Sequence, residues 1–71
     1  MSISYKKLWK LLIDKDMTKT QLREKADIAT STLAKLSKDK QVSMDVLLRI
    51  CKTLECDIAD IMELTKESKN V

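Results

Sequence analysis

The segment DIATSTLAKLSKDK, residues 27–40, collects polar side chains of this 71-residue chain that could take part in recognition. It begins a predicted helix with three consecutive hydroxyl residues, Thr30, Ser31 and Thr32. Leu33 and Leu36 follow at the spacing of one helix face. Ser and Thr are poor helix formers because their side chains compete for backbone hydrogen bonds, so one of them would suffice as a cap. Three in a row indicate a second role.

The chemistry of this segment follows from the directions of its side chains. At about 100° per residue, Leu33 and Leu36 define the buried side of a helix over residues 30–37. The opposite face carries small polar residues and lysines with threonines on its flanks, namely Ser31, Lys35 and Lys38 between Thr30 and Thr32. Hydroxyl groups bond to either kind of base edge, lysine bonds to guanine acceptors, and a threonine methyl contacts the thymine methyl. The segment therefore predicts a helix that enters the major groove of DNA.

A second short helix is predicted immediately before this one. The sequence TKTQ, residues 18–21, is a capping box in which Thr18 caps the backbone and Gln21 bonds back to it. The helix that it starts extends to about Lys25 and is followed by the turn ADIA. Two short helices joined by such a turn have the geometry of a helix-turn-helix motif.

Three further helices are predicted around this pair. Caps mark their starts at Ser4, Ser43 and Asp57, the last with Asp60 three residues later. Apolar stripes mark their inward faces, which carry Tyr5, Leu8, Trp9 and Leu12, then Leu47, Ile50, Cys51 and Leu54, then Ile58, Ile61 and Met62.

The predicted fold is all-α, because the chain contains no Gly and no Pro, the two residues that break helices. The lack of a sustained period of two argues against a long strand and leaves short extended segments open. We expect one compact five-helix domain over residues 1–66 and a flexible C-terminal tail over residues 67–71. The residues expected to share its core are Leu22, Ile28, Leu33, Leu36, Leu47, Ile50, Leu54, Ile58 and Ile61.

Charge is distributed unevenly along the chain. Residues 1–40 contain ten Lys and Arg against five Asp and Glu, a net +5, and residues 41–71 contain four against six, a net −2. A basic front and an acidic rear favour a protein that presents one side to a polyanion.

Other functional classes lack the residues that they need. With no His and two Cys, the chain has too few ligands for a zinc site, and Cys51 and Cys56 are interpreted as reduced, small hydrophobic residues. The sequence shows no Gly-rich phosphate loop and no base beside a nucleophile, which argues against an enzyme and against a cofactor. No apolar run could span a membrane, and neither a signal peptide nor a small-molecule effector site is evident. We expect a cytoplasmic protein.

The stretch from Leu8 to about Leu64 resembles the lambda-repressor-like, or Cro/CI (XRE-type), helix-turn-helix DNA-binding domains. The two motif helices lie in MTKTQLREKADIATSTLAKL, and KQVSMDVLLRICKTLECDIADIME is similar to the family's C-terminal part. The resemblance implies a bacterial, phage or mobile-element transcription regulator, usually dimeric on a partly palindromic operator of double-stranded DNA.

The resemblance also implies roles for seven residues. Base-reading positions fall on Thr30, Ser31, Thr32 and Lys35, and phosphate-contacting positions fall on Lys19, Lys38 and Lys40.

Four positions depart from the family pattern. Asp27, Asp39 and Glu55 stand where the family commonly has Gly, and Asp tolerates the left-handed backbone better than most residues. The two aspartates also place negative charge near the phosphate face. Ala29 stands where the family has a hydroxyl cap, so Thr30 is expected to cap the third helix, which would then begin one residue later.

The resulting hypothesis is a sequence-specific DNA-binding transcriptional regulator, acting as a repressor. We expect a homodimer joined through the fifth helix and the tail, where Met62 and Leu64 are apolar beyond the needs of the core. The alternative is an antitoxin or anti-repressor of the same fold that binds another protein. Exposed Ser, Thr and Lys favour DNA, because protein-binding faces are enriched in aromatic residues and Met.

Overall fold

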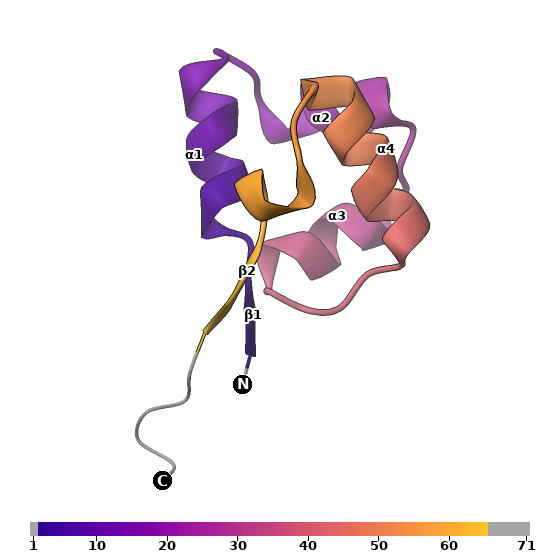
Figure 1. Ribbon diagram of the computed structural model, residues 1–71. Helices are drawn as coiled ribbons and strands as arrows, with labels where there is room; N and C mark the ends of the chain where they lie inside the picture. The colour runs from indigo at the N-terminus through magenta and orange to yellow at the C-terminus, as the bar shows by residue number, and fades with distance from the viewer. Residues whose placement is uncertain (1, 66–71) are drawn as a thin grey trace, which may run out of the picture.

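The computed structural model describes residues 2–65, so the tail predicted over residues 67–71 lies outside the described residues. Within residues 2–65 the chain forms four α-helices, one 3-10 turn and two short strands (Figure 1). In chain order these are β1 Ser2–Ser4, α1 Lys6–Asp14, α2 Lys19–Ala26, α3 Thr30–Ser37, α4 Met44–Leu54, η1 Ile58–Asp60 and β2 Glu63–Thr65. The helix-turn-helix pair, α2 and α3, has the predicted order and nearly the predicted bounds.

The prediction of a fifth α-helix is wrong. Asp57 and Asp60 form the expected reciprocal cap, with the Asp57 N–H donating to Asp60 Oδ2 at 3.0 Å, but they start a single 3-10 turn. The chain then extends into β2, which pairs antiparallel with β1 so that Ile3 lies opposite Leu64. Because both strands have three residues, neither is long enough to show a period of two in the sequence.

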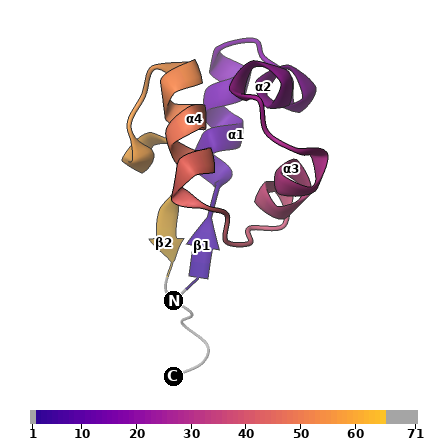
Figure 2. The same ribbon diagram turned by 90° about the vertical axis from the view of Figure 1, so that its right-hand side faces the viewer.

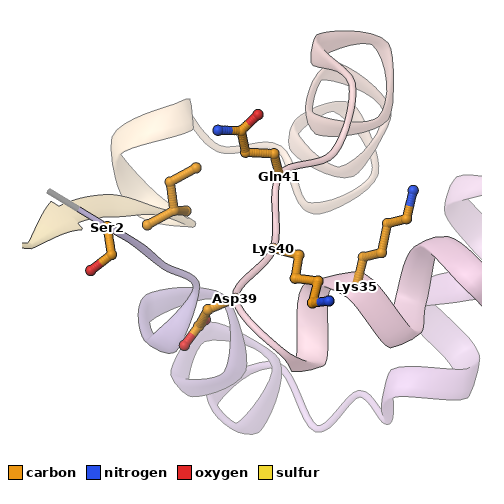
Figure 3. Close-up of a pocket in the computed structure, with 6 residues that line it drawn as sticks. Ser2, Lys35, Asp39, Lys40 and Gln41 are labelled. Carbon is orange, nitrogen blue, oxygen red and sulfur yellow. The ribbon is translucent and has the colours of Figure 1, made fainter.

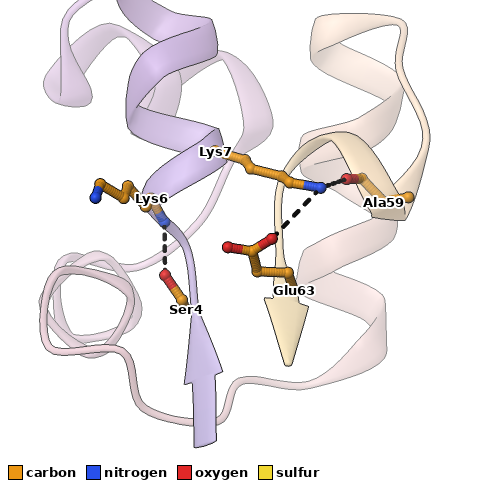
Figure 4. Close-up of polar contacts among 5 residues, drawn as sticks. All are labelled: Ser4, Lys6, Lys7, Ala59 and Glu63. Atoms are coloured by element: carbon orange, nitrogen blue, oxygen red, sulfur yellow. Dashed lines mark hydrogen bonds and ion pairs between the residues drawn. The ribbon is translucent and has the colours of Figure 1, made fainter. Parts of the chain in front are cut away.

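The two strands form a ribbon that projects from one end of the helical bundle (Figures 1 and 2). Lys7, on α1, connects the base of this ribbon to η1. Its Nζ donates to the Ala59 carbonyl at 3.1 Å and pairs with Glu63 Oε1, on β2, at 3.6 Å (Figure 4). Ser4 belongs to β1 and does not cap the first helix as predicted, although its Oγ accepts from the Lys6 N–H at 3.3 Å. The helix-flanking residue is Tyr5, whose N–H donates to Asp39 Oδ1 at 3.0 Å.

Left-handed turns connect the helices without any glycine. Asp16, Asp27, Asp39 and Glu55 all have φ between 54° and 56°. Three of these are the positions at which glycine was expected from the family, and two of those three are aspartates, which adopt this backbone more readily than most residues. Glu55 is held there by the helix end itself, since the Cys56 N–H donates to the Cys51 carbonyl at 3.0 Å.

One hydrophobic core joins the four helices and η1. Seven of the nine predicted core residues are buried, and Leu33 and Ile58 are half-buried against them. Tyr5, Leu8 and Leu12 add the face of α1 that its apolar stripe predicts. The helices of the motif are thereby fixed on α1 and α4.

Candidate nucleic-acid interface

Helix α3 lies at one side of the helical bundle (Figure 2). Most of its polar residues are exposed, and its two leucines belong to or pack against the core. Leu36 is fully buried and Leu33 packs half-buried against the core. Ser31 and Lys35 are exposed, as are Thr30 and Lys38, whereas Thr32 is half-buried. The face that the sequence assigns to DNA is therefore accessible along the whole helix.

The entrance of α3 is not capped by a side chain. The helix starts at Thr30, and the flanking position belongs to Ala29, whose backbone is extended and whose carbonyl accepts the Leu33 N–H at 3.0 Å. The expectation that Thr30 caps a helix starting one residue later is wrong. The reason is that Ala29 already has the extended backbone of a flanking residue, with ψ 155°, which places Thr30 inside the first turn. The hydroxyl groups at this end thus serve no cap.

Arg49, on α4, forms a hydrogen bond to the turn between α2 and α3. Its Nη1 donates to the carbonyl of Asp27 at 2.8 Å, and its Nε lies 3.1 Å from Asp45 Oδ2 one helical turn away. Asp27 is the left-handed residue that ends α2, so this contact fixes the point where the chain changes direction. Sequence reasoning missed Arg49, although its spacing of four from Asp45 was visible.

Tyr5, the residue that flanks the start of α1, forms hydrogen bonds to the loop after α3. The buried phenol donates to the carbonyl of Lys40 at 3.0 Å, and the Tyr5 N–H donates to Asp39 Oδ1. Burial, with the charge of Asp39 as a second cause, raises the pKa of Tyr5 above its usual 10.0. The phenol therefore remains a donor at neutral pH, and the Asp39 carboxylate accepts a bond within the protein.

Lys35 and Lys40 lie on one side of an open groove, with Ser2 on the other side and Asp39 and Gln41 at its border (Figure 3). The groove therefore separates the C-terminal end of α3 from the strand β1. Lys38, at the end of α3, is exposed as well. Three predicted site lysines are thus gathered at this end of the helix.

Lys19 occupies a different position from the other lysines. It is the first residue of α2, and its Nζ lies 4.2 Å from the centroid of the Trp9 ring on α1. The same Nζ donates to Ser37 Oγ, in the last residue of α3, at 3.4 Å. The structure consequently brings the seven predicted residues to three places around α3, which are its entrance, its C-terminal end and the α2 entrance.

Groups for other chemistry are not assembled in the part of the chain that the structure describes. No three His, Cys, Asp or Glu side chains in residues 2–65 could share a metal ion. No helix there has the length and apolar character that crossing a membrane requires. Burial, followed by the neighbouring Cys56, raises the pKa of Cys51 from 9.0 to about 11, so this thiol is protonated and a poor nucleophile at neutral pH.

Comparison with known sequences agrees with this geometry. Residues 7–67 match the sequence model of the Cro/C1-type helix-turn-helix DNA-binding domain. The match covers most of the chain, so the protein belongs to this family, as its resemblance predicted. A search of curated protein sequences found no match.

Among solved structures, the fold is similar to the crystal structure of the transcriptional regulator VanUg, Form II. The TM-score is 0.90 at 55% sequence identity, over 93% of this chain and 88% of that chain.

Proposed function

We propose that the protein is a sequence-specific transcription regulator, acting as a repressor in the cytoplasm, whose helix α3 enters the major groove of DNA. The observation that carries this proposal is the entrance of α3, where Thr30 and Ser31 are exposed and no side-chain cap is formed. Membership of a DNA-binding family and similarity to a transcriptional regulator support it.

Base reading is assigned to the outward face of α3. Thr30, Ser31 and Lys35 are exposed, and Thr32, one turn before the buried Leu36, is half-buried beside them. Short hydroxyl side chains allow the helix end to approach base edges closely, and Lys35 extends one turn further to reach a guanine acceptor. The uncapped first-turn amides add favourable interactions with a nearby phosphate.

Backbone contacts are assigned to the lysines at the margins of this face. Lys38 and Lys40 lie at the C-terminal end of α3 and Lys19 lies at the start of α2. Each would neutralise a phosphate and release a counterion, so these contacts add affinity without sequence preference.

A homodimer on a partly palindromic operator completes the proposal. One recognition helix reads few base pairs, and two helices about 34 Å apart would read successive turns of the major groove. Leu64 supports such an interface because 62% of its surface is exposed, although it lies on β2 and not on a fifth helix. Repression then requires only that the bound dimer occupies a promoter.

The direct test is selection of binding sites from random double-stranded oligonucleotides at two salt concentrations. The proposal expects an enriched motif with two related half-sites, and a reporter placed downstream of that motif should be silenced by the protein. Lys38→Gln should weaken binding to all sequences alike and lower the salt slope by about one, whereas Lys52→Gln, in the last turn of α4, should not. Selection without any enriched motif would contradict the proposal.

A protein-binding role, as in an antitoxin or anti-repressor, is the second candidate. Met44 and Leu48 favour it, because they lie one turn apart on α4 and are 59% and 56% exposed. Two results together would favour this second candidate over DNA binding. The selection would yield no enriched motif, and the protein would bind another protein in a way that Leu48→Lys abolishes.

A further inference from the structure

Three helices of the protein meet at the ammonium group of Lys19. Its side chain extends from the start of α2, its Nζ lies over the ring of Trp9 on α1, and it donates to Ser37 at the end of α3. The distances are 4.2 Å to the ring centroid and 3.4 Å to Ser37 Oγ.

The two partners of this ammonium group, the Trp9 ring and Ser37 Oγ, differ in how strongly they fix its position. The Trp9 ring is half-buried and packed against the core, so its position is fixed by the fold. A hydrogen bond of 3.4 Å to an exposed hydroxyl is long, and such a contact is exchanged easily. The ring is therefore the permanent platform, and Ser37 is a partner that another acceptor can replace.

Lys19 is an exposed residue, and its ammonium group stands at the end of a flexible four-carbon stem. Ordering such a side chain costs conformational entropy, which lowers the gain from each contact that it makes. An aromatic face attracts the cation and also packs against its methylene groups. The Trp9 ring thus limits the ammonium to a small region beside the C-terminal end of α3.

We propose that Trp9 is a positioning residue for DNA binding, which holds Lys19 ready for a phosphate of the DNA backbone. On binding, a phosphate oxygen replaces Ser37 Oγ as the acceptor while the ring keeps the ammonium in place. This inference rests on the phosphate contact that the proposed function assigns to Lys19. It adds a residue of the first helix to the binding machinery, in a place where Trp9 would otherwise be regarded as a core residue alone.

A double-mutant cycle separates positioning from packing. Trp9→Leu removes the aromatic face, Lys19→Gln removes the cation, and the double variant removes both. Trp9→Phe retains an aromatic face and serves as the conservative variant, and it also provides the measurement if Trp9→Leu does not fold. Leu11→Ala is the matched packing control, because Leu11 is half-buried on the same helix and packs against the same core as Trp9. Affinity for the selected site and for unrelated DNA is measured for each.

Trp9→Leu should weaken binding to both DNAs about two- to fivefold, the value of an exposed cation–π contact. In the Lys19→Gln background the same substitution should have no further effect, and Trp9→Phe should restore most of the affinity. Because the chain has one Trp, its fluorescence reports the contact directly, and both Lys19→Gln and added DNA should change its emission.

Two results would overturn the inference in different ways. If Trp9→Leu lowers affinity equally with and without Lys19, as Leu11→Ala is expected to do, Trp9 acts through packing alone. If Lys19→Gln leaves the salt slope unchanged, Lys19 binds no phosphate and the premise taken from the proposed function fails. The base preference of α3, measured by selection, is independent of both results and tests the proposed function separately.

Discussion

The entrances of α2 and α3 use similar residues for different purposes. At α2, Thr18 Oγ1 accepts the Gln21 N–H at 3.1 Å and the Thr18 N–H donates to Gln21 Oε1 at 2.9 Å, which completes a capping box. At α3, three hydroxyl residues stand in the first turn, and the flanking position is held by Ala29 without a side-chain bond. Hydroxyl groups stabilise the first entrance and are left unused by the second.

The difference indicates which helix is built for stability and which for contact. The start of α4 agrees with that of α2, because Ser43 Oγ accepts the Val46 N–H at 3.2 Å. Among these three helices, the one with the most hydroxyl residues at its start is the one whose start they do not cap. A side chain that contributes little to the fold is free to be selected for recognition.

The largest expected effect tests how α3 is held without a cap. Leu36 is fully buried, so Leu36→Ala should lower the free energy of unfolding by about 2–5 kcal/mol. Leu33 is half-buried, so Leu33→Ala should cost clearly less. Chemical denaturation of both variants measures the difference, and equal losses would show that α3 is anchored along both leucines.

The next effect concerns sequence preference and leaves stability unchanged. Ser31 and Lys35 are exposed, so replacing either by Ala should relax preference at one or two base positions by about 1–3 kcal/mol. Thr20→Ala, at an exposed hydroxyl on α2, is the matched control and should keep the wild-type preference. Binding to a library of single-base changes in the selected site measures these profiles. Unchanged profiles for Ser31→Ala and Lys35→Ala would remove α3 as the reader.

The contrast between the entrances also explains what sequence could predict. A capping box occupies four consecutive residues, so its pattern in TKTQ predicted the start of α2 correctly. The periodicity of Leu33 and Leu36 likewise predicted which face of α3 is exposed. These features depend on neighbours within one or two helical turns.

Features that join distant residues were missed. Ser2 pairs with Thr65 across the ribbon. Strands of three residues are too short for their pairing to be predicted from a period of two in the sequence. The bond from Arg49 to Asp27 and the contact of Lys19 with Trp9 depend on how whole helices pack. The cap at Asp57 predicted where a helical turn starts, but the length of η1 is limited by the chain's return to β1.

A smaller effect is expected at the loop that carries Lys38 and Lys40. Tyr5→Phe removes the bond to the Lys40 carbonyl and should cost about 0.5–1.5 kcal/mol of stability. Because the folded-state pKa of Tyr5 is raised above 10.0, its stabilising contribution is complete below about pH 10 and is lost as pH rises through the folded pKa. The free energy of unfolding, measured as a function of pH, should therefore fall less steeply above pH 10 in Tyr5→Phe than in the wild-type protein. Identical alkaline profiles for the two proteins would contradict this assignment.

The smallest effect is the most direct test of the two entrances. Thr18→Ala removes one of the two bonds of the capping box and should lower the free energy of unfolding by about 1 kcal/mol. Thr30→Ala removes no capping bond, and as an exposed substitution it should change stability by less than about 0.5 kcal/mol. The order should reverse when affinity for the selected DNA is measured, since Thr30 lies at the proposed reading end and Thr18 does not. If Thr30→Ala instead destabilises the protein as much as Thr18→Ala while leaving base preference unchanged, the hydroxyl residues at α3 serve its stability, and the contrast between the two entrances disappears.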